Sequence, residues 1–382
     1  MTHRIVLPRM LETGAGAIRR LPAVLETLGC RHPLIVTDQM MVSLGHVELL
    51  DDVLGSAGMS CGVFAETEPE PSELSLLPAV QQLKDGSFDS IVALGGGRAI
   101  GVLGKHGGRM ADYKVPRDVT EAGLPVIAIP TTAGAGSEAT RFTIITDAES
   151  DEKMLCMVLA FMPLAAIIDF ELTITAPPRV TADTGIDALT HGIEAYVSQK
   201  ASPFSDQQAL SAIALLAPNL RRVYHNPDDR EAREAMMLGS TLAGIAFSNA
   251  SVALVHGMSR PIGAHFHVPH GLSNAMLLPA ITRFSLPGAP ARYAQCARTM
   301  GIATPKDSDT LANERLLDEL QAINRELQVP SMADFGIARE KYVSLQGLMA
   351  QQALASGSPG NNPRVPSEAE IVDLYEQVWH QA

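Results

Sequence analysis

The pattern of apolar and polar positions divides the chain into two parts. Up to about Asp169, short runs of consecutive apolar residues alternate with longer stretches that carry apolar residues at helical spacing. Near-continuous apolar runs are typical of strands in a parallel sheet that is covered on both faces. The runs that we interpret as strands are 33–36, 90–94, 125–129, 142–145 and 165–168. We therefore expect an α/β domain in the first half.

From about Pro177 onward the strand signal fades. Segments 204–224, 230–247 and 311–327 carry apolar residues at helical spacing, with good helix formers between them. Consecutive prolines at 177 and 178 cannot continue a preceding helix, and the small polar residues of 181–184 are candidate caps for the next one. The prediction is an α/β domain over residues 1–180 and an all-helical domain over 181–382.

Composition restricts the partners and the compartment. The chain has 29 Lys and Arg against 42 Asp and Glu, a formal charge of −13, so its field repels a polyanion and we expect no nucleic-acid partner. We find neither a signal peptide nor a run of about 18 apolar residues, and we expect a cytoplasmic protein without a membrane partner. Its 4 cysteines form no Cys-x-x-Cys pair, which argues against a disulfide scaffold and a thiolate zinc site.

Two glycine-rich turns follow predicted strands and indicate a nucleotide. Leu94-Gly-Gly-Gly97 opens a helix, so its backbone N–H groups can approach a diphosphate without obstruction. The segment 130–138, Pro-Thr-Thr-Ala-Gly-Ala-Gly-Ser-Glu, adds small and hydroxyl residues. One such turn alone is equally well a tight strand-to-helix connection, because neither matches Gly-x-Gly-x-x-Gly. Two at strand ends favour a dinucleotide.

Asp38 follows the first predicted strand. A carboxylate there accepts hydrogen bonds from the ribose hydroxyls of adenosine and repels a 2′-phosphate. This favours NAD over NADP, and the alternative is a turn or capping aspartate.

Four residues form a candidate metal site. Asp187 and His191 are four apart in a stretch of helical spacing, so they lie on one helix face. His256 stands at the end of the apolar run 253–256, and His270 stands in the turn 268–271. Three imidazoles and one carboxylate suit Zn²⁺ or Fe²⁺, and the ligand set does not choose between them. His265 and His267 compete for places in the site.

The ordered combination of these segments resembles the iron-containing (group III) alcohol dehydrogenase family along nearly the whole chain. The two long matching stretches are Pro130-Thr-Thr-Ala-Gly-Ala-Gly-Ser-Glu138 and Asp183-Thr-Gly-Ile-Asp-Ala-Leu-Thr-His-Gly-Ile-Glu-Ala-Tyr196. Shorter matches are 14–16, 36–38, 95–97, 255–258, 268–271 and 362–364. The resemblance implies a fold like that of dehydroquinate synthase, with a dinucleotide-binding α/β domain, a helical metal-binding domain and a cleft between them. It also implies a homo-oligomer, a dimer or larger.

Carried over position by position, the family's functional residues fall on these motifs. Its metal ligands correspond to Asp187, His191, His256 and His270. Its NAD contacts correspond to Asp38, Gly96, Gly97, Thr131, Thr132 and Lys153, and its pocket wall to Phe142 and Phe247, for which ordinary core aromatics are the alternative.

The chain departs from the family's pattern at five positions. The family commonly has Ser at 98, Asp at 101, Lys at 104 and Thr at 135, where this chain has Arg98, Gly101, Gly104 and Ala135. Arg260 stands where many members place a second His, and arginine stays protonated at neutral pH, so it cannot relay a proton. We expect His267 to be the substitute catalytic relay, with a structural histidine as the alternative, and Arg260 to bind a carboxylate of the substrate.

The resemblance implies a metal-dependent NAD(H)-linked alcohol dehydrogenase or aldehyde reductase. Its substrates would be small alcohols, diols or hydroxy acids, and the metal would polarise the substrate oxygen for hydride transfer. The alternatives are a maleylacetate reductase, suggested by Gly101, a lyase of the dehydroquinate synthase type, and a non-catalytic relative that binds nucleotide or metal.

Overall fold

The chain packs into two compact units. The computed structural model describes residues 2–68, 71–97, 99–115, 119, 121–148 and 153–379, so Arg98 lies outside the described residues. One unit comprises 6–132 and 136–176, and the other comprises 1–5, 133–135 and 177–382. We call them the α/β unit and the helical unit. Separate domains over 1–180 and 181–382 stay a prediction, which independent folding of the two parts would test.

A parallel sheet forms the centre of the α/β unit. Its strand order is β1-β8-β5-β4-β2-β3, and every neighbouring pair is parallel. The strands are β1 (Met10–Thr13), β2 (Pro33–Val36), β3 (Gly62–Phe64), β4 (Ser90–Leu94), β5 (Val126–Ile129) and β8 (Ala165–Ile168). The predictions for β2, β4, β5 and β8 are confirmed.

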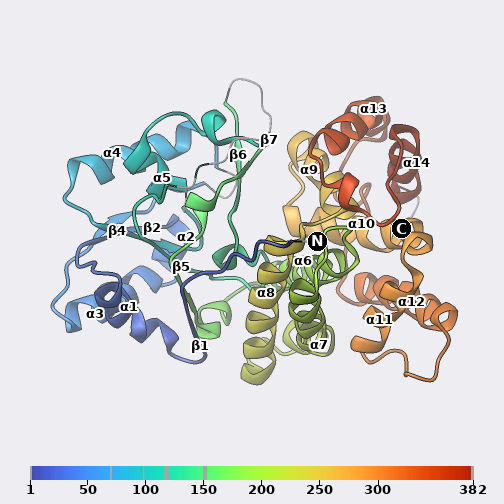
Figure 1. Ribbon diagram of the computed structural model, residues 1–382, viewed down its shortest axis with the longest axis horizontal. Coiled ribbons are helices and arrows are strands. Elements are labelled where there is room, and N and C mark those ends of the chain that lie inside the picture. Colours follow the sequence, from blue (N-terminus) through green and yellow to red (C-terminus); the bar gives the residue numbers. More distant parts are fainter. Residues whose placement is uncertain are drawn as a thin grey trace. The chain divides into compact units, whose positions relative to one another are not determined.

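Helices cover both faces of this sheet (Figure 1). One face packs on α1 (Leu21–Thr27) and α3 (His46–Ser56), and the other packs on α4 (Leu77–Asp85) and α5 (Ala99–His106). Within β2, the side chain of Ile35 packs in the core with α1 and α3. The side chains of Leu34 and Val36 pack in the core with α4 and α5. Because both sets of side chains are buried, the strand reads as a continuous apolar run rather than an alternating one.

The strand predicted at 142–145 belongs to a different sheet. β6 (Phe142–Thr146) pairs antiparallel with β7 (Lys153–Met157), outside the parallel sheet (Figure 1). In both strands buried residues alternate with partly exposed ones. The apolar run thus misled the assignment, because a hairpin with one covered face can still carry apolar residues on the other.

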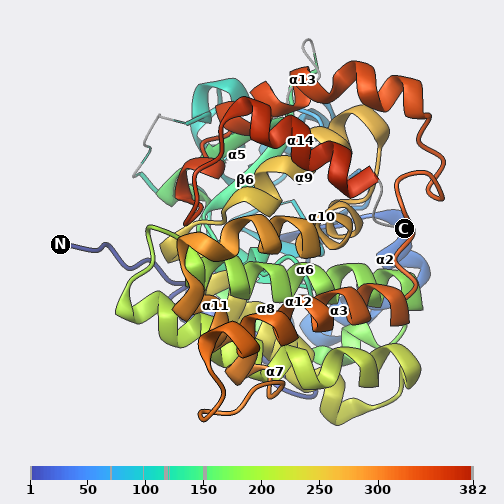
Figure 2. The same ribbon diagram turned by 90° about the vertical axis from the view of Figure 1, so that its right-hand side faces the viewer.

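The helical unit is built around a buried helix, α6 (Pro178–Val197). In Figure 2 it runs through the middle of this unit beside α10, and it also packs against α7 and α8. Every residue from Gly185 to Val197 is buried, including Asp187, His191 and Glu194. Buried charged groups need compensating partners. The partners of these three side chains therefore define a candidate site.

The other helices follow α6 in order along the chain. They are α7 (Pro203–His225), α8 (Arg230–Ala250), α9 (Leu254–Phe266), α10 (His270–Ser285), α11 (Pro290–Thr299), α12 (Asp309–Glu326), α13 (Arg339–Ala355) and α14 (Glu368–Trp379). The predicted helices at 204–224, 230–247 and 311–327 are confirmed as α7, α8 and α12.

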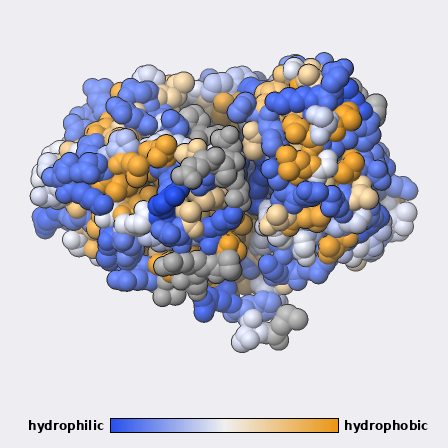
Figure 3. Space-filling model, turned by 90° about the horizontal axis from the view of Figure 1, so that it is seen from above, coloured by the Kyte–Doolittle hydropathy of each residue, from blue (hydrophilic) through white to orange (hydrophobic). Residues whose placement is uncertain are grey.

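The surface mixes hydrophilic residues with small apolar patches on the face drawn in Figure 3, which is ordinary for a folded protein. Within the described residues, no single helix has the length and apolar character to cross a bilayer, although α8 and α9 together pass that test as a pair bent by 103°.

Candidate metal centre

Three polar side chains share one face of α6. Asp187, His191 and Glu194 are four and then three residues apart, which brings them onto the same side of a helix. All three are buried, and none is more than 4% exposed. The sequence pattern predicted the first pair, and the structure places it as expected.

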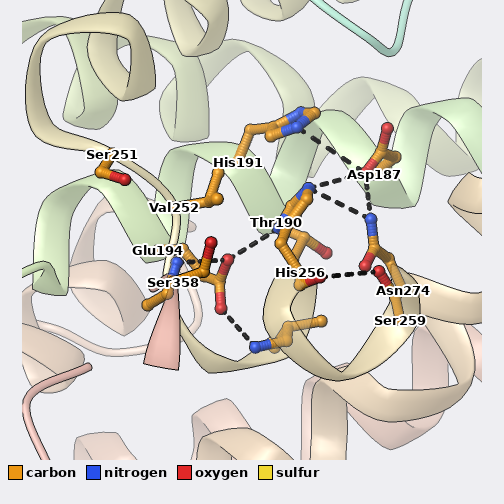
Figure 4. Close-up of polar contacts among 12 residues, drawn as sticks. Asp187, Thr190, His191, Glu194, Ser251, Val252, His256, Ser259, Asn274 and Ser358 are labelled. Carbon is orange, nitrogen blue, oxygen red and sulfur yellow. Dashed lines mark hydrogen bonds and ion pairs between the residues drawn. The ribbon is translucent and has the colours of Figure 1, made fainter. Parts of the chain in front are cut away.

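Asp187, His191, His256 and His270 converge. Each offers one ligand atom, and these four atoms lie within 4.8 Å of one another. Asp187 Oδ1 lies 3.4 Å from His256 Nε2 and 3.9 Å from the Nε2 atoms of His191 and His270. The rings of His191 and His256 stack with centroids 4.4 Å apart (Figure 4). The two competing histidines, His265 and His267, are not part of this cluster.

The two remaining histidines come from the starts of helices. His256, which ends the apolar run 253–256, is the third residue of α9, because α9 begins at Leu254. His270 is the first residue of α10 and follows Pro269. Side chains in the first turn of a helix project from a fixed point of the backbone, so two helix starts can aim two imidazoles at α6.

The electrostatics of the cluster favour a cation. Burial alone raises the pKa of Asp187, but the three histidines around it outweigh this and hold its pKa well below its usual range. Burial lowers the pKa of His191 to about 4, and partial burial together with the neighbouring imidazoles of His256 and His191 lowers the pKa of His270. These two imidazoles are therefore neutral and carry free lone pairs at pH 7.

His256 behaves differently from the other two histidines. Burial lowers its pKa, but its hydrogen bonds to Asp187 and Glu194 outweigh burial and raise the pKa to about 9. At neutral pH the carboxylates of Asp187 and Glu194 therefore carry two negative charges, whereas His256 is the protonated imidazole among the three. The remaining negative charge favours a bound cation.

Glu194 is a functional residue that sequence reasoning missed. Its Oε2 accepts hydrogen bonds from Ala253 N–H at 2.9 Å and from His256 Nδ1 at 2.7 Å, and its Oε1 accepts one from Val255 N–H at 2.6 Å (Figure 4). A carboxylate on Nδ1 fixes the ring and directs Nε2 toward a metal, as in carboxylate–histidine–zinc triads. The sequence signal that could have identified it is its position seven residues after Asp187, which places both carboxylates on the same face of a helix.

Asn274 also touches the cluster. It lies four residues after His270 on α10, and its Nδ2 is 2.6 Å from Asp187 Oδ1, 3.1 Å from His256 Nε2 and 3.2 Å from His270 Nε2. Its hydrogen bond to Asp187 orients the carboxylate. No local motif marked it beforehand, because its partners Asp187 and His256 come from other helices.

A glycine follows each histidine ligand and allows close packing. A Cβ at Gly271 would lie 2.6 Å from the carbonyl oxygen of Asp183, and one at Gly257 would lie 2.8 Å from Pro359. At Gly192 the nearest atom, from Ile213, would be 3.1 Å away. The glycines thus let α10 and α9 approach their neighbours and carry the imidazoles inward.

The donor set fits a transition metal. One carboxylate and three imidazoles are ligands that Zn²⁺ and Fe²⁺ accept. His270 has a side chain 39% exposed, whereas the other three ligands are at most 5% exposed. The cluster is therefore reachable from solvent on the His270 side, as a catalytic metal requires.

The other predicted site residues of the helical unit have different surroundings. The ring of Phe247 stacks on His191 with centroids 4.3 Å apart, so it contacts a ligand directly. Arg260, one turn after His256 on α9, donates from Nη1 to Ser358 Oγ at 3.0 Å. His267 is exposed at the end of α9 with a left-handed φ of 56°.

The predicted nucleotide turns lie at the carboxyl ends of adjacent strands. Gly96 and Gly97 follow β4, and Thr131 and Thr132 follow β5. Along the chain, β2 is followed by β3 toward one edge of the sheet, and β4 is followed by β5 toward the opposite edge. The strand order therefore reverses between the neighbouring strands β2 and β4. In open α/β sheets such a reversal forms the crevice for a nucleotide.

Asp38 follows β2, the strand on the other side of this reversal. Its Oδ1 accepts the N–H of Met41 at 3.0 Å and caps α2 (Gln39–Ser43), so the capping role that we considered is present. Lys153 opens β7 opposite Thr146, and Phe142 opens β6. All three belong to the α/β unit.

Packing explains two of the departures from the family's pattern. A Cβ at Gly101 would lie 2.9 Å from Val126 Cγ2, and one at Gly104 would lie 2.2 Å from Leu83 Cδ2. Both glycines therefore let α5 lie close to its neighbours. Gly101 consequently gives no separate support to a maleylacetate reductase.

Family models match both halves of the chain. A model described as iron-containing alcohol dehydrogenase matches residues 8–170, and a model of the C-terminal part of the Fe-containing alcohol dehydrogenase family matches residues 181–379.

Individual relatives match over almost the full length. Long-chain-alcohol dehydrogenase 1 of Geobacillus thermodenitrificans is 38% identical, over 98% of this chain and 96% of its own length. Lactaldehyde reductase of Escherichia coli is 33% identical, over 99% of this chain and 100% of its own. A solved 1,3-propanediol oxidoreductase superposes with a TM-score of 0.94 at 32% identity, over 99% of this chain and 100% of the other. The chain thus belongs to the iron-containing alcohol dehydrogenase family of oxidoreductases.

Proposed function

We propose that this protein interconverts small alcohols and their aldehydes or ketones with NAD(H), at an Fe²⁺ or Zn²⁺ ion held by Asp187, His191, His256 and His270. The observation that carries the proposal is the convergence of these four ligand atoms within 4.8 Å in a chain of this family. When bound, the ion supplies Lewis-acid polarisation of the substrate oxygen, and the nicotinamide accepts or donates the hydride.

The protein's own residues prepare the site for this chemistry. Asp187 balances the charge of the ion, and Glu194 fixes the ring of His256 through the hydrogen bond at Nδ1. Phe247 packs on His191 and limits the movement of that ring. Together they hold the ligands in one geometry before a substrate arrives.

For the nucleotide, we propose that Gly96, Gly97, Thr131 and Thr132 bind the diphosphate. Asp38 would bind the adenosine ribose, and Lys153 and Phe142 would complete the site. The strand-order reversal between β2 and β4 supports this assignment. Asp38 accepts one hydrogen bond through Oδ1, and its second oxygen can accept another, so the helix cap is compatible with a ribose contact and with NAD rather than NADP.

A proton must leave the alcohol during oxidation, and we propose His267 as its relay. The side chain is exposed and stands three residues before His270. Histidine is the side chain that most often transfers protons in enzymes. The His267→Gln variant should lower kcat for alcohol oxidation while the metal content stays unchanged.

The proposed function is tested with protein stripped of metal and reloaded with Fe²⁺ or Zn²⁺. NADH formation should require the metal and should disappear in Asp187→Ala and His270→Ala variants that remain folded. Parallel titrations with NADH and NADPH test the cofactor. Absence of turnover with every metal and nucleotide, in folded protein, would overturn the proposal and favour the non-catalytic relative.

We also propose that the protein acts as a homo-oligomer in the cytoplasm. Membership of the family supports both statements. Light scattering tests the first, and cell fractionation tests the second.

A further inference from the structure

Arg260 has no carboxylate partner among the residues that the structure describes. It lies on α9, and its Nη1 donates to the neutral hydroxyl of Ser358 at 3.0 Å. Its Nε is buried and has no hydrogen-bond partner among the described residues. Within the same residues, no carboxylate lies within ion-pair distance of the guanidinium, which sets it apart from the paired arginines of this unit such as Arg221 and Arg292.

The surroundings of Arg260 do not supply the missing charge. Burial lowers its pKa to about 10, and Glu194 opposes this from a distance. Glu194 already accepts three N–H groups, from Ala253, Val255 and His256. Arg260 stays charged at neutral pH, and a desolvated charge without a partner is costly. Such a residue is expected to meet an anion that the described part of the chain does not provide.

Arg260 also stands beside the metal cluster. It follows His256 by four residues on the same helix, so both side chains lie on one face, with Cβ atoms about 5–6 Å apart. Its charge acts on His270, the ligand on the solvent-accessible side of the cluster. An anion bound to Arg260 would therefore belong to a molecule that also reaches the cluster.

We infer that Arg260, held by Ser358, is an anion subsite for the substrate, and that the protein prefers short hydroxy acids and aldehyde acids to neutral alcohols. This inference rests on the proposed function. The planar guanidinium suits a carboxylate because it can donate two parallel hydrogen bonds. The separation along α9 fits roughly two to four carbon atoms between the carboxylate and the reacting oxygen.

The first test compares an acidic substrate with a neutral one. For wild type and Arg260→Gln, kcat/KM is measured with 4-hydroxybutyrate and with 1-butanol, using NAD and the reloaded metal. A charge-assisted pair stabilises by about 1.5–3 kcal/mol, so the preference for the acid should fall about 10- to 100-fold in the variant. Arg283→Gln on α10 is the matched control, because that side chain is exposed. An unchanged preference in Arg260→Gln would overturn the inference.

A binding measurement separates this subsite from catalysis. Metal-stripped protein saturated with NADH is titrated calorimetrically with butyrate and with butyramide, so that the carboxylate cannot bind through the ion. Wild type should bind butyrate at least 10-fold more tightly than butyramide, and Arg260→Gln should bind both alike. If butyrate binds in this way but no alcohol is turned over, the proposed function fails and the subsite stands. Turnover of 1-butanol without selective binding of butyrate would overturn the subsite alone.

A purely structural role for Arg260 predicts a different result. If the residue only holds the segment around Ser358, Ser358→Ala and Arg260→Gln should lower the melting temperature equally and leave acid and neutral substrates affected alike, which would overturn the inference. Arg260→Lys keeps the charge without the planar fork. It provides the second variant, and it should retain part of the preference for the acid even if the glutamine variant folds poorly.

Discussion

At the scale of single residues, Glu194 combines two tasks in one carboxylate. It accepts the backbone N–H groups of Ala253 and Val255, which stand at the start of α9 and have no acceptor within the helix. It also accepts the N–H of His256 Nδ1. The start of the helix and the orientation of the ligand therefore depend on the same side chain, which is 3% exposed.

We predict that Glu194→Gln lowers the metal affinity by about 10- to 100-fold. The amide lacks the negative charge and places an NH₂ group opposite the N–H donors of α9. Metal affinity is measured by competition with a chromophoric chelator, and Glu234→Gln, an exposed position on α8, is the control. Wild-type affinity in the Glu194 variant would contradict the orienting role.

At the scale of elements, the approach of α10 to α6 depends on Gly271. We predict that Gly271→Ala lowers the free energy of unfolding by about 1–3 kcal/mol, because the new Cβ would lie 2.6 Å from Asp183 O. It should also weaken metal binding, since His270 is the preceding residue and must shift with α10.

Gly347→Ala on α13 is the matched control for that variant. No atom lies within 4 Å of its Cβ position, so alanine should stabilise the helix by roughly 0.5–1 kcal/mol. Chemical denaturation measures both variants. Equal free energies of unfolding for the two variants would show that α10 can move away from α6 without loss of stability.

The turn between β4 and α5 allows a prediction that separates folding from nucleotide binding. Gly97 has φ +93°, and its Cβ would lie 2.4 Å from Val36 Cγ1, whereas no atom lies within 4 Å of a Cβ at Gly96. We predict that Gly97→Ala destabilises the protein by about 2–4 kcal/mol. Gly96→Ala should keep the wild-type stability and lose NADH affinity, because its Cβ would face the diphosphate.

Denaturation and NADH fluorescence titration provide the two measurements for these variants. Unchanged NADH affinity in Gly96→Ala would contradict the assignment of this turn to the cofactor. Unchanged stability in Gly97→Ala would mean that β2 can move away from the turn.

The sequence predicted those elements whose signal is local. β2 and β4 are buried along their whole length, and their apolar runs revealed them. β1 and β3 are edge strands with exposed residues and gave no such run. Helical spacing paired Asp187 with His191. Glu194 escaped notice although it lies on the same helix, because its partners come from α9, and no local pattern can show which distant backbone a carboxylate meets.

At the scale of the whole molecule, the four proposed metal ligands all belong to the helical unit, and the proposed nucleotide-binding residues Gly96, Gly97, Thr131 and Thr132 belong to the α/β unit. A ligand that binds only the folded state stabilises it by about 2.7 kcal/mol at a concentration of 100 times its Kd. We predict that metal slows hydrogen exchange in α6, α9 and α10, and that NADH does so in 95–97 and 130–132. Hydrogen exchange with each ligand separately measures this, and metal protection confined to the strands would contradict the proposed ligand set.

The spacing of Asp187, His191 and Glu194 also limits how the chain can change in length. One residue inserted among them would turn everything that follows by about 100° around the axis of α6, and a deletion would turn it by as much in the opposite sense. Related sequences should therefore align through this stretch without gaps. Length variation should collect instead in exposed connections such as 226–229 and 301–308, where added residues alter no helical phase and the buried carboxylates keep their partners.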